Sequence, residues 1–257
     1  MEVIVSYCTD AGNRKKTNQD SLSVKVVNSP KGKIVFAVVC DGMGGLAHGE
    51  MASREVVMAF VEWFEVEFAR LVAQDMVSED TVHDQWQEVI VRTNESLGEY
   101  ANREGTMMGS TVSVLLLYQE EYYICHVGDS RIYRINEKTK QLTNDQTLVA
   151  WEVEMGKLTE EEAKVDPRRS VLLQCVGASE EVRPQYERGK ITGNTTFVLS
   201  SDGFVHKITK EELQDMFSPE RIQDKQHLTQ ICETAVDIVM ERGELDNVTV
   251  VAIALKK

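Results

Sequence analysis

The sequence has few of the features that build linkers, membrane spans or targeting signals. Only 4 of its 257 residues are proline, and it contains no internal repeat or low-complexity segment, so long linkers and disordered arms are not expected. No apolar run approaches the length that crosses a bilayer, and the N-terminus lacks a signal-peptide pattern. We therefore expect one cytoplasmic domain over residues 1–257, large enough to bury its own core.

Cysteine is sparse, and its spacing suggests neither a disulfide framework nor a zinc site. The chain has 5 cysteines, an odd number, without a CxxC pair. We expect buried free thiols in a reducing compartment. They are Cys8, Cys40, Cys125, Cys175 and Cys232.

Positive charge is also in short supply. The 28 Lys and Arg residues face 42 Asp and Glu residues, which gives a net charge of −14. This balance disfavours nucleic acid and anionic membranes as partners, because both need a basic surface. The acidic excess has two readings: a solvated surface that keeps the protein soluble, or carboxylates that cluster around bound cations.

What the sequence does contain is a recurring pattern of aspartates at strand ends. The apolar, β-branched run Ile34–Cys40 predicts a buried strand that stops at Asp41, ahead of a glycine-rich stretch. The alternating run Ser21–Val27 predicts its hairpin partner, directly after Asp20. Both carboxylates should therefore lie at one end of the hairpin, where they could share an ion. Taken alone, the Asp-Gly pair could equally be an ordinary tight turn.

Three more aspartates repeat this arrangement. Asp129 and Asp202 each lie beside a glycine where an apolar strand ends, and Asp246 precedes the last predicted strand. Converging carboxylates repel one another strongly unless cations offset them. An all-oxygen set favours Mg²⁺ or Mn²⁺, and a pair of such ions lowers the pKa of a bound water and holds a phosphoryl group in line. The pattern therefore indicates phosphoryl transfer to water.

The basic triplet Arg14-Lys15-Lys16 lies four residues before Asp20. Most such triplets are simply solvated. This one is placed to neutralise the oxygens of a phosphate at the expected site.

The rest of the chain alternates long helical patterns with groups of strands, as expected for helices layered on a sheet. Residues 144–170 differ, because they are mostly polar, carry two short helical patterns and interrupt the strands; we interpret them as an inserted flap. Strands are predicted over 3–8, 112–118, 122–127, 132–135, 171–176, 182–188, 196–200 and 248–254, and helices over 49–74, 79–103, 210–217 and 226–242.

In this order, the motifs resemble the bacterial form of the protein phosphatase 2C family, the metal-dependent serine/threonine phosphatases. No single motif is decisive, but the set is specific and spans essentially the whole chain. The resemblance implies an α+β fold: a four-layer α/β/β/α sandwich of two antiparallel β-sheets flanked by paired helices, with a small flap at about 144–170. The matching segments are Asp10–Gly12, Asn18–Asp20, Asp41–Gly45, Gly49–Ser53, Gly109–Thr111, Val127–Arg131, Ser200–Gly203 and Asp246–Thr249.

The resemblance also implies a role for each aspartate. Asp41 would bridge two Mn²⁺ or Mg²⁺ ions, and the Gly42 carbonyl would help to hold the first ion. Asp202 and Asp246 would complete the shell of the second ion, and Asp20 would act nearby through water. Asp129 would serve a weaker third ion.

One departure from the family pattern concerns the phosphate. The arginine expected five residues before Asp20 is Lys15 here, with Arg14 beside it. Lysine offers a point charge rather than a bidentate fork, so either residue could bind the phosphate. The predicted catalytic residues are Asp41, Asp202 and Lys15, and the predicted phosphate-binding residues are Lys15 and Arg14.

A second departure concerns the proton donor. Met43 stands where eukaryotic relatives carry a histidine proposed as the general acid, and it cannot donate a proton. The acid is then either metal-bound water, as bacterial relatives imply, or another residue. His48 and His126 are the nearest histidines in sequence, although each is more simply explained as a surface or packed side chain.

We therefore predict an Mg²⁺- or Mn²⁺-dependent protein serine/threonine phosphatase in which a metal-bridging water attacks the phosphoryl group. One alternative is a catalytically weak relative that acts as a phosphoprotein-binding regulatory module, favoured only by Lys15. Another is a two-metal enzyme for small phosphoesters. The resemblance implies phosphorylated proteins as partners, made by a serine/threonine kinase, and we expect a monomer.

Overall fold

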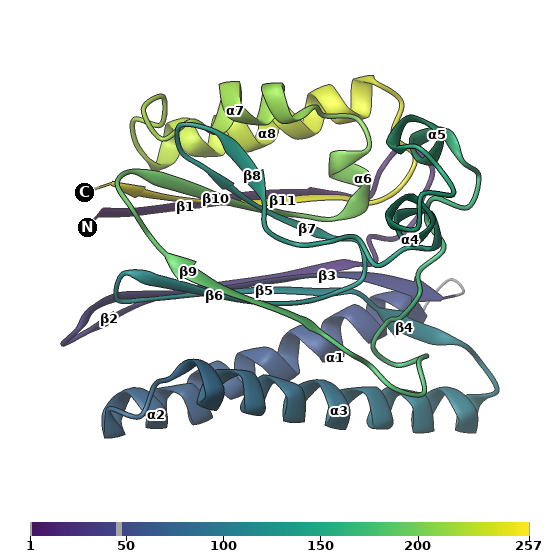
Figure 1. The fold of residues 1–257 in the computed structure, drawn as a ribbon, viewed down its shortest axis with the longest axis horizontal. Helices are drawn as coiled ribbons and strands as arrows, with labels where there is room; N and C mark the ends of the chain where they lie inside the picture. The colour runs from purple at the N-terminus through teal and green to yellow at the C-terminus, as the bar shows by residue number, and fades with distance from the viewer. Residues whose placement is uncertain (1, 45–47, 257) are drawn as a thin grey trace.

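A computed structural model describes residues 2–44 and 48–256, so Gly45 of the predicted glycine-rich motif lies outside the described residues. The chain forms two antiparallel sheets that pack face to face, with helices on both outer faces (Figure 1). This is the predicted four-layer α/β/β/α arrangement. Among the described residues, no helix has both the length and the apolar composition that crossing a bilayer requires.

The first sheet has the order β2-β3-β5-β6-β9, with β4 paired to the far end of β3. It is covered on its outer face by the long helices α1 and α3 (Figure 1). Its strands are β2 (Asp20–Ser29), β3 (Gly32–Gly44), β4 (Met108–Ser110), β5 (Val112–Tyr118), β6 (Glu121–Val127) and β9 (Gln185–Lys190).

The second sheet has the order β1-β11-β10-β7-β8 and is covered by α7 and α8. Its central strand β11 comes from the end of the chain and pairs with β1 from the beginning, so both ends of the chain meet in one sheet. Its strands are β1 (Glu2–Asp10), β7 (Arg131–Ile135), β8 (Thr139–Gln141), β10 (Thr195–Ser200) and β11 (Val248–Lys256).

The helices begin and end where local chemistry allows. α3 (Glu79–Glu104) begins at a capping box between Ser78 and Thr81 and ends at Gly105, which has a φ of 63°. The predicted helix over 49–74 is α1 (His48–Trp63), a π-helical turn η1 (Phe64–Phe68) and α2 (Ala69–Gln74). The helices of the second layer are α6 (Asp202–Val205), α7 (Lys210–Phe217) and α8 (Lys225–Glu241).

Three apolar cores hold the layers together. One lies under α1 and α3 and includes Phe36, Phe60 and Trp86, all at most 1% exposed. A second lies under α7 and α8 and includes Phe204 and Phe217. The third joins the two sheets and fixes their separation, and therefore the distance between the residues that each sheet contributes to one end of the sandwich.

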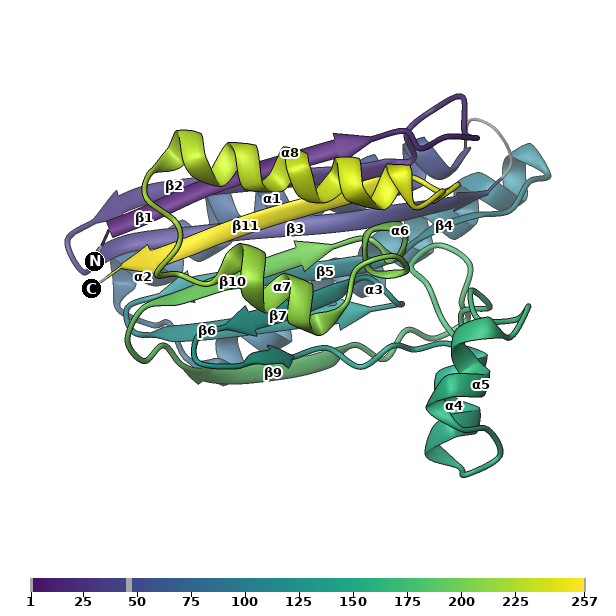
Figure 2. The same cartoon turned by 90° about the horizontal axis from the view of Figure 1, so that it is seen from above.

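The segment predicted as a flap carries α4 (Leu148–Glu154) and α5 (Glu160–Val165), which stand outside the two sheets (Figure 2). α4 begins at Leu148 and is capped by Thr147, whose side chain accepts a hydrogen bond from the Ala150 N–H. The predicted strand over 171–176 is wrong: this segment makes only isolated bridges, Leu172 with Thr147 and Val176 with Ser110. Val176 packs into the core under α1 and α3, whereas Val171 and Leu173 are 48% and 52% exposed. β8 was not predicted, because three half-exposed polar residues carry no strand pattern.

The strand that carries Asp41 also differs from its prediction. β3 does not stop at the aspartate but continues to Gly44, where it pairs with β4. Met43 lies opposite Gly109 in this extension. Asp41 is therefore fixed by ladder pairing on both sides rather than lying at the start of a loop.

Candidate functional site

The hairpin β2–β3 places Asp20 directly opposite Asp41. This confirms the prediction that both carboxylates lie at the same end of the pair. The backbone of Asp41 is held twice by Thr111, whose hydroxyl accepts from the Asp41 N–H at 2.9 Å and whose N–H donates to the Asp41 carbonyl at 2.9 Å. The Asp20 carboxylate accepts a hydrogen bond from the Ser201 hydroxyl at 2.8 Å, which ties the two sheets together.

The other three predicted aspartates reach the same end of the sandwich from the second sheet. Asp129 lies between β6 and β7, Asp202 opens α6 directly after β10, and Asp246 lies two residues before β11. Asp41 is the centre of the group, because its carboxyl group feels the charges of all four others. The structure thus brings together residues that are up to 226 positions apart in sequence, taken as 246 minus 20.

Burial and mutual repulsion disturb the protonation of this group. Burial, reinforced by Asp20 and Asp202, raises the pKa of Asp41 well above its usual range. Burial also raises the pKa of Asp20 to about 7, although the Thr249 and Ser201 hydroxyls lower it. Four carboxylates with raised pKa values at one end of the sandwich are costly to keep charged unless a positive charge offsets them.

The same is true of the carboxylates on the second sheet. Burial raises the pKa of Asp129, and the charge of Asp202 adds to this effect. Burial raises the pKa of Asp202 as well, although His206 lowers it. The Asp41 and Asp202 carboxyl groups lie close enough to affect each other's pKa.

Several oxygens at this site have no partner. The buried Oδ1 atoms of Asp20 and Asp202 accept no hydrogen bond from any described residue. Buried carboxylate oxygens are normally satisfied, and hard divalent cations take such oxygens as ligands. No three Asp, Glu, His or Cys side chains in residues 2–44 and 48–256 converge into a ready-made cage. The unpartnered carboxylate oxygens suit a hard cation that keeps several water ligands of its own, as Mg²⁺ does.

Gly42 and Gly44, which follow Asp41 on β3, lie against the backbone of neighbouring segments. A Cβ on Gly42 would lie 2.0 Å from the Gly49 carbonyl oxygen, and one on Gly44 would lie 2.9 Å from that of Met107. These glycines let β3 pack tightly against the start of α1 and the approach to β4.

Asn247 joins the two halves of the site. The sequence pattern identified it only as part of the segment Asp246–Thr249. Its amide donates to the Ala11 carbonyl at 2.8 Å and to the Thr17 carbonyl at 3.2 Å, and its Oδ1 accepts from the Gln19 N–H at 2.9 Å. The loop that carries the basic triplet is thereby fixed against the segment that carries Asp246.

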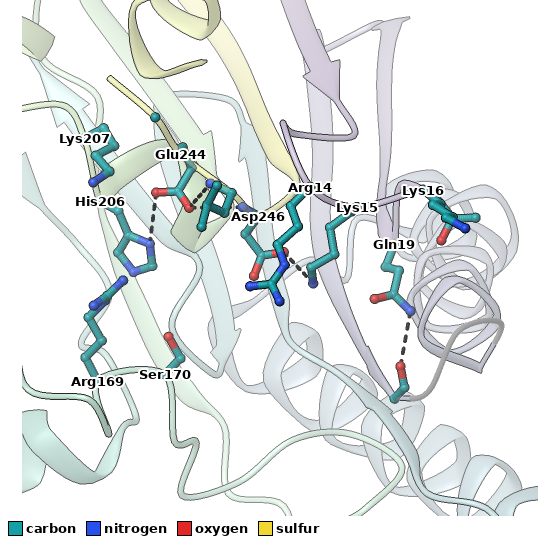
Figure 3. A pocket seen from close by; sticks show the side chains of 14 residues that line it. Arg14, Lys15, Lys16, Gln19, Arg169, Ser170, His206, Lys207, Glu244 and Asp246 are labelled. Carbon is teal, nitrogen blue, oxygen red and sulfur yellow. Dashed lines mark hydrogen bonds and ion pairs between the residues drawn. The ribbon is translucent and has the colours of Figure 1, made fainter. Parts of the chain in front are cut away.

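A pocket of about 660 Å³ opens beside the carboxylates (Figure 3). It shares Asp246 with them but lies next to Asp41 and Asp202 rather than over them. Its lining residues are Arg14, Lys15, Lys16, Thr17, Gln19, Gly44, Arg169, Ser170, His206, Lys207, Gly243, Glu244, Leu245 and Asp246.

Both predicted phosphate-binding residues lie in this pocket. The Lys15 ammonium group is 2.8 Å from the Asp246 carboxylate, and although burial alone would lower its pKa, Asp246 raises it. Lys15 therefore stays charged and faces the aspartates, while Arg14 lines the pocket beside it (Figure 3).

The two histidines named from the sequence, His48 and His126, do not line this pocket. His126 is fully buried; its Nδ1 is 2.9 Å from the Ser113 hydroxyl, and its Nε2 is 3.0 Å from the Gly128 carbonyl. Burial lowers the pKa of His126 to about 4. It is a packed structural residue. His48 begins α1 and is half-buried.

Sequence reasoning missed His206 and Glu244. The His206 ring lies 3.7 Å from Asp202 and 3.6 Å from Glu244, between the two carboxylates. The buried Glu244 carboxylate also accepts from the N–H groups of Leu245 and Asp246, and, although burial opposes it, His206 and these donors lower its pKa to about 2. The signal was present: His206 follows Asp202 at the i,i+4 spacing of one helical face.

Known proteins are similar to this chain in sequence and in fold. The model of a family described as protein phosphatase 2C matches residues 10–243. The protein phosphatase PhpP of Streptococcus pneumoniae is 29% identical over 257 residues, 98% of each chain. The serine/threonine phosphatase stp of Listeria innocua is 28% identical over 251 residues, 96% of this chain and 94% of that one.

A solved structure agrees with this match. The serine/threonine phosphatase of S. agalactiae superposes with a TM-score of 0.84 at 25% identity and covers 98% of this chain and 99% of that one. The chain therefore belongs to the protein phosphatase 2C family and is an enzyme of the phosphoprotein phosphatase class. The resemblance and the two-sheet fold predicted from the motifs are both confirmed.

Proposed function

We propose that this chain is an Mg²⁺- or Mn²⁺-dependent protein serine/threonine phosphatase that hydrolyses phosphoserine and phosphothreonine by direct attack of water. The observation that carries the proposal is the group of five aspartates at one end of the two sheets, in which buried oxygens of Asp20 and Asp202 have no partner among the described residues. Repulsion within such a group lowers the free energy of unfolding, and bound cations are the simplest way to offset that loss.

Asp41, Asp202, Asp246 and the Gly42 carbonyl would hold two ions, with Asp20 acting through water and Asp129 serving a third. When bound, such ions lower the pKa of a water molecule and offset the negative charge of the phosphoryl group. Thr111 and the β3–β4 ladder fix the position of Asp41, because they hold its backbone on both sides. Preorganised carboxylates need little rearrangement during the reaction.

Lys15 and Arg14 would bind the phosphate oxygens. The Lys15 ammonium group already faces the carboxylates, so it lies close to the place where the phosphoryl group must sit. Arg14 forms no ion pair within residues 2–44 and 48–256, which leaves its guanidinium available for bidentate contact.

The test is hydrolysis of a phosphothreonine peptide with added Mn²⁺ or with a chelator. We expect Asp41→Asn and Asp202→Asn to lower kcat by about 100-fold or more, since each removes charge that is fixed at the reacting group. Asp215→Asn, which removes a surface carboxylate paired with Arg221, is the matched control. Unchanged rates in the first two variants would rule the proposal out.

Two further comparisons separate the alternatives. A regulatory module would bind the phosphopeptide but fail to hydrolyse a chromogenic phosphate ester with Mn²⁺. An enzyme for small phosphoesters would turn over a metabolite much faster than phosphopeptides. Lys15→Ala and Arg14→Ala, compared with Lys15→Arg, assign the phosphate contact: the variant with the larger rise in KM identifies the residue that binds the substrate phosphate.

A further inference from the structure

The pocket beside the aspartates gathers positive charge in a chain whose net charge is −14. Its lining contains five lysines and arginines against two carboxylates. The five cations of the lining are Arg14, Lys15, Lys16, Arg169 and Lys207, and its two carboxylates are Glu244 and Asp246. The proposed phosphate contact uses only the cations of the β1–β2 loop.

Two of these cations come from another part of the chain. Arg169 lies at the end of the flap segment, and Lys207 follows α6. Figure 3 shows both beside His206, on the far side of Glu244 from Arg14. The pocket therefore has a basic group on each side, and only one of them is needed for a single phosphate.

The charges of Arg169 and Lys207 are not used inside the protein. Within residues 2–44 and 48–256, neither side chain forms an ion pair. The adjacent Arg168 differs, because it pairs with Glu152 at 2.8 Å and Asp166 at 2.9 Å.

The nearest acid of the pocket is already engaged. Glu244 lies 3.6 Å from His206 and accepts from two backbone N–H groups, at 2.8 Å and 3.0 Å. Two cations that have no ion-pair partner and that solvent can reach attract an anion from outside the protein.

We propose that Arg169 and Lys207 form a second anion subsite, which binds a phosphate or carboxylate group that the substrate protein carries close to its scissile phosphate. The inference rests on the proposed function, because it assigns the far side of the same pocket. The pocket volume of about 660 Å³ is in the range that holds a drug-sized ligand rather than one phosphate group. The preferred substrates are therefore acidic or multiply phosphorylated segments.

The test uses phosphothreonine peptides that differ only at flanking positions. These positions carry alanine, lysine, glutamate or a phosphonate analogue of phosphoserine that cannot be hydrolysed. We expect kcat/KM to be highest for the two acidic peptides. The double variant Arg169→Ala/Lys207→Ala should reduce the ratio of kcat/KM for the acidic peptide to kcat/KM for the alanine peptide by roughly fivefold. The effect is limited to this size because exposed charge pairs are individually weak. Added salt should reduce the ratio in the wild type as well.

Lys164→Ala is the matched control, because this flap lysine pairs with Glu161 and does not line the pocket. It should leave the ratio unchanged. A preference for the phosphonate peptide alone would assign the subsite to a second phosphate, and a preference for both would assign it to anions in general. Equal kcat/KM for all wild-type peptides, or a proportional loss for all peptides in the double variant, would overturn the subsite.

A second readout separates this inference from the proposed function. Binding of the same peptides is measured by fluorescence anisotropy, which needs no turnover. If Mn²⁺-dependent hydrolysis is absent while acidic peptides still bind more tightly and the double variant loses that preference, the hydrolytic function fails and the subsite stands. Equal binding of acidic and alanine peptides overturns the subsite whether or not hydrolysis occurs.

Discussion

At the scale of single residues, Asp41 is the aspartate whose pKa is raised by the charges of all four others. Its carboxyl group is buried and surrounded by four others, so its charge is costly when no cation is present. Such a residue is kept at a cost in stability for the sake of its function, which is common where charges are arranged for catalysis.

This argument predicts that Asp41→Asn stabilises the metal-free protein. Asparagine removes the charge and keeps the shape, so we expect the free energy of unfolding at pH 8 in a chelator to rise by roughly 2 kcal/mol. Urea unfolding measures this value. Asp215→Asn, at an exposed ion pair, should change it by less than about 0.5 kcal/mol. A loss of stability in Asp41→Asn would show that the carboxylates do not repel one another.

His126 gives a second prediction, on the pH dependence of stability. Its folded pKa is about 4 because of burial, whereas an unfolded histidine titrates near 6.5. Between these values the unfolded chain binds a proton that the folded chain excludes, so this residue destabilises the fold as the pH falls through that window.

The variant His126→Gln cannot titrate, and comparing it with the wild type cancels all other groups. We expect the destabilisation caused by the substitution to be about 2 kcal/mol smaller at pH 5 than at pH 7.5. Urea unfolding at both values gives the difference. A destabilisation that is the same at both pH values would mean that folding does not shift the pKa of His126.

The residues of the site were predictable to different degrees. Asp20 and Asp41 could be paired from sequence, because hairpin register follows from a short turn. The i,i+4 spacing gave a signal for His206 beside Asp202, but its approach to Glu244 could not be predicted, because it depends on how α6 meets the segment before β11. Gly42 was singled out for its carbonyl, and only the fold shows that the Gly49 backbone lies against it.

At the scale of elements, a half-buried ion pair fixes the base of the flap. The Arg131 guanidinium binds both oxygens of Asp145, at 2.6 Å and 2.8 Å for its shortest contacts. Beside it, the Gly128 N–H donates to the Gln146 side chain at 2.8 Å, and the Gln146 N–H donates to the Gly128 carbonyl at 2.8 Å. These contacts join the flap to the loop that carries Asp129.

We therefore expect Asp145→Asn to loosen the flap. Removing one partner leaves the Arg131 charge partly buried and unpaired, which should lower the free energy of unfolding by about 1–3 kcal/mol and speed amide exchange over 144–170. Glu152→Gln breaks a pair between the flap helix and the more exposed Arg168, and should cost less than about 1 kcal/mol. Equal exchange rates in Asp145→Asn and the wild type would contradict this account.

Elements with a strong period were predicted well, and segments without one were not. α3 and β11 follow from their helical and apolar patterns. The apolar run over 171–176 resembles a strand but forms none, because its backbone makes only two single bridges, from Leu172 to Thr147 and from Val176 to Ser110. Tertiary packing decided between a strand and an irregular segment, and no local signal distinguishes them.

At the scale of the whole molecule, the site joins the two sheets. Asp20 and Asp41 belong to the first sheet, and Asp202 and Asp246 flank strands of the second. The sandwich could be predicted from the resemblance of the motifs, but the distance between the sheets depends on the core between them. Any cation bound by all four residues would hold the sheets together and act on the fold as a whole.

This predicts a saturable rise in thermal stability on adding Mn²⁺. A ligand at 100 times its Kd stabilises the folded state by about 2.7 kcal/mol, which for a chain of this size raises Tm by roughly 5–10 °C. Asp202→Asn should lose most of the shift, because it removes a carboxylate that comes from the second sheet. Asp215→Asn, which lies on α7 far from these residues in the fold, should keep the full shift. Scanning calorimetry across a Mn²⁺ titration measures the effect, and a Tm that does not respond to Mn²⁺ in the wild type would mean that the aspartates do not bind the ion between the sheets.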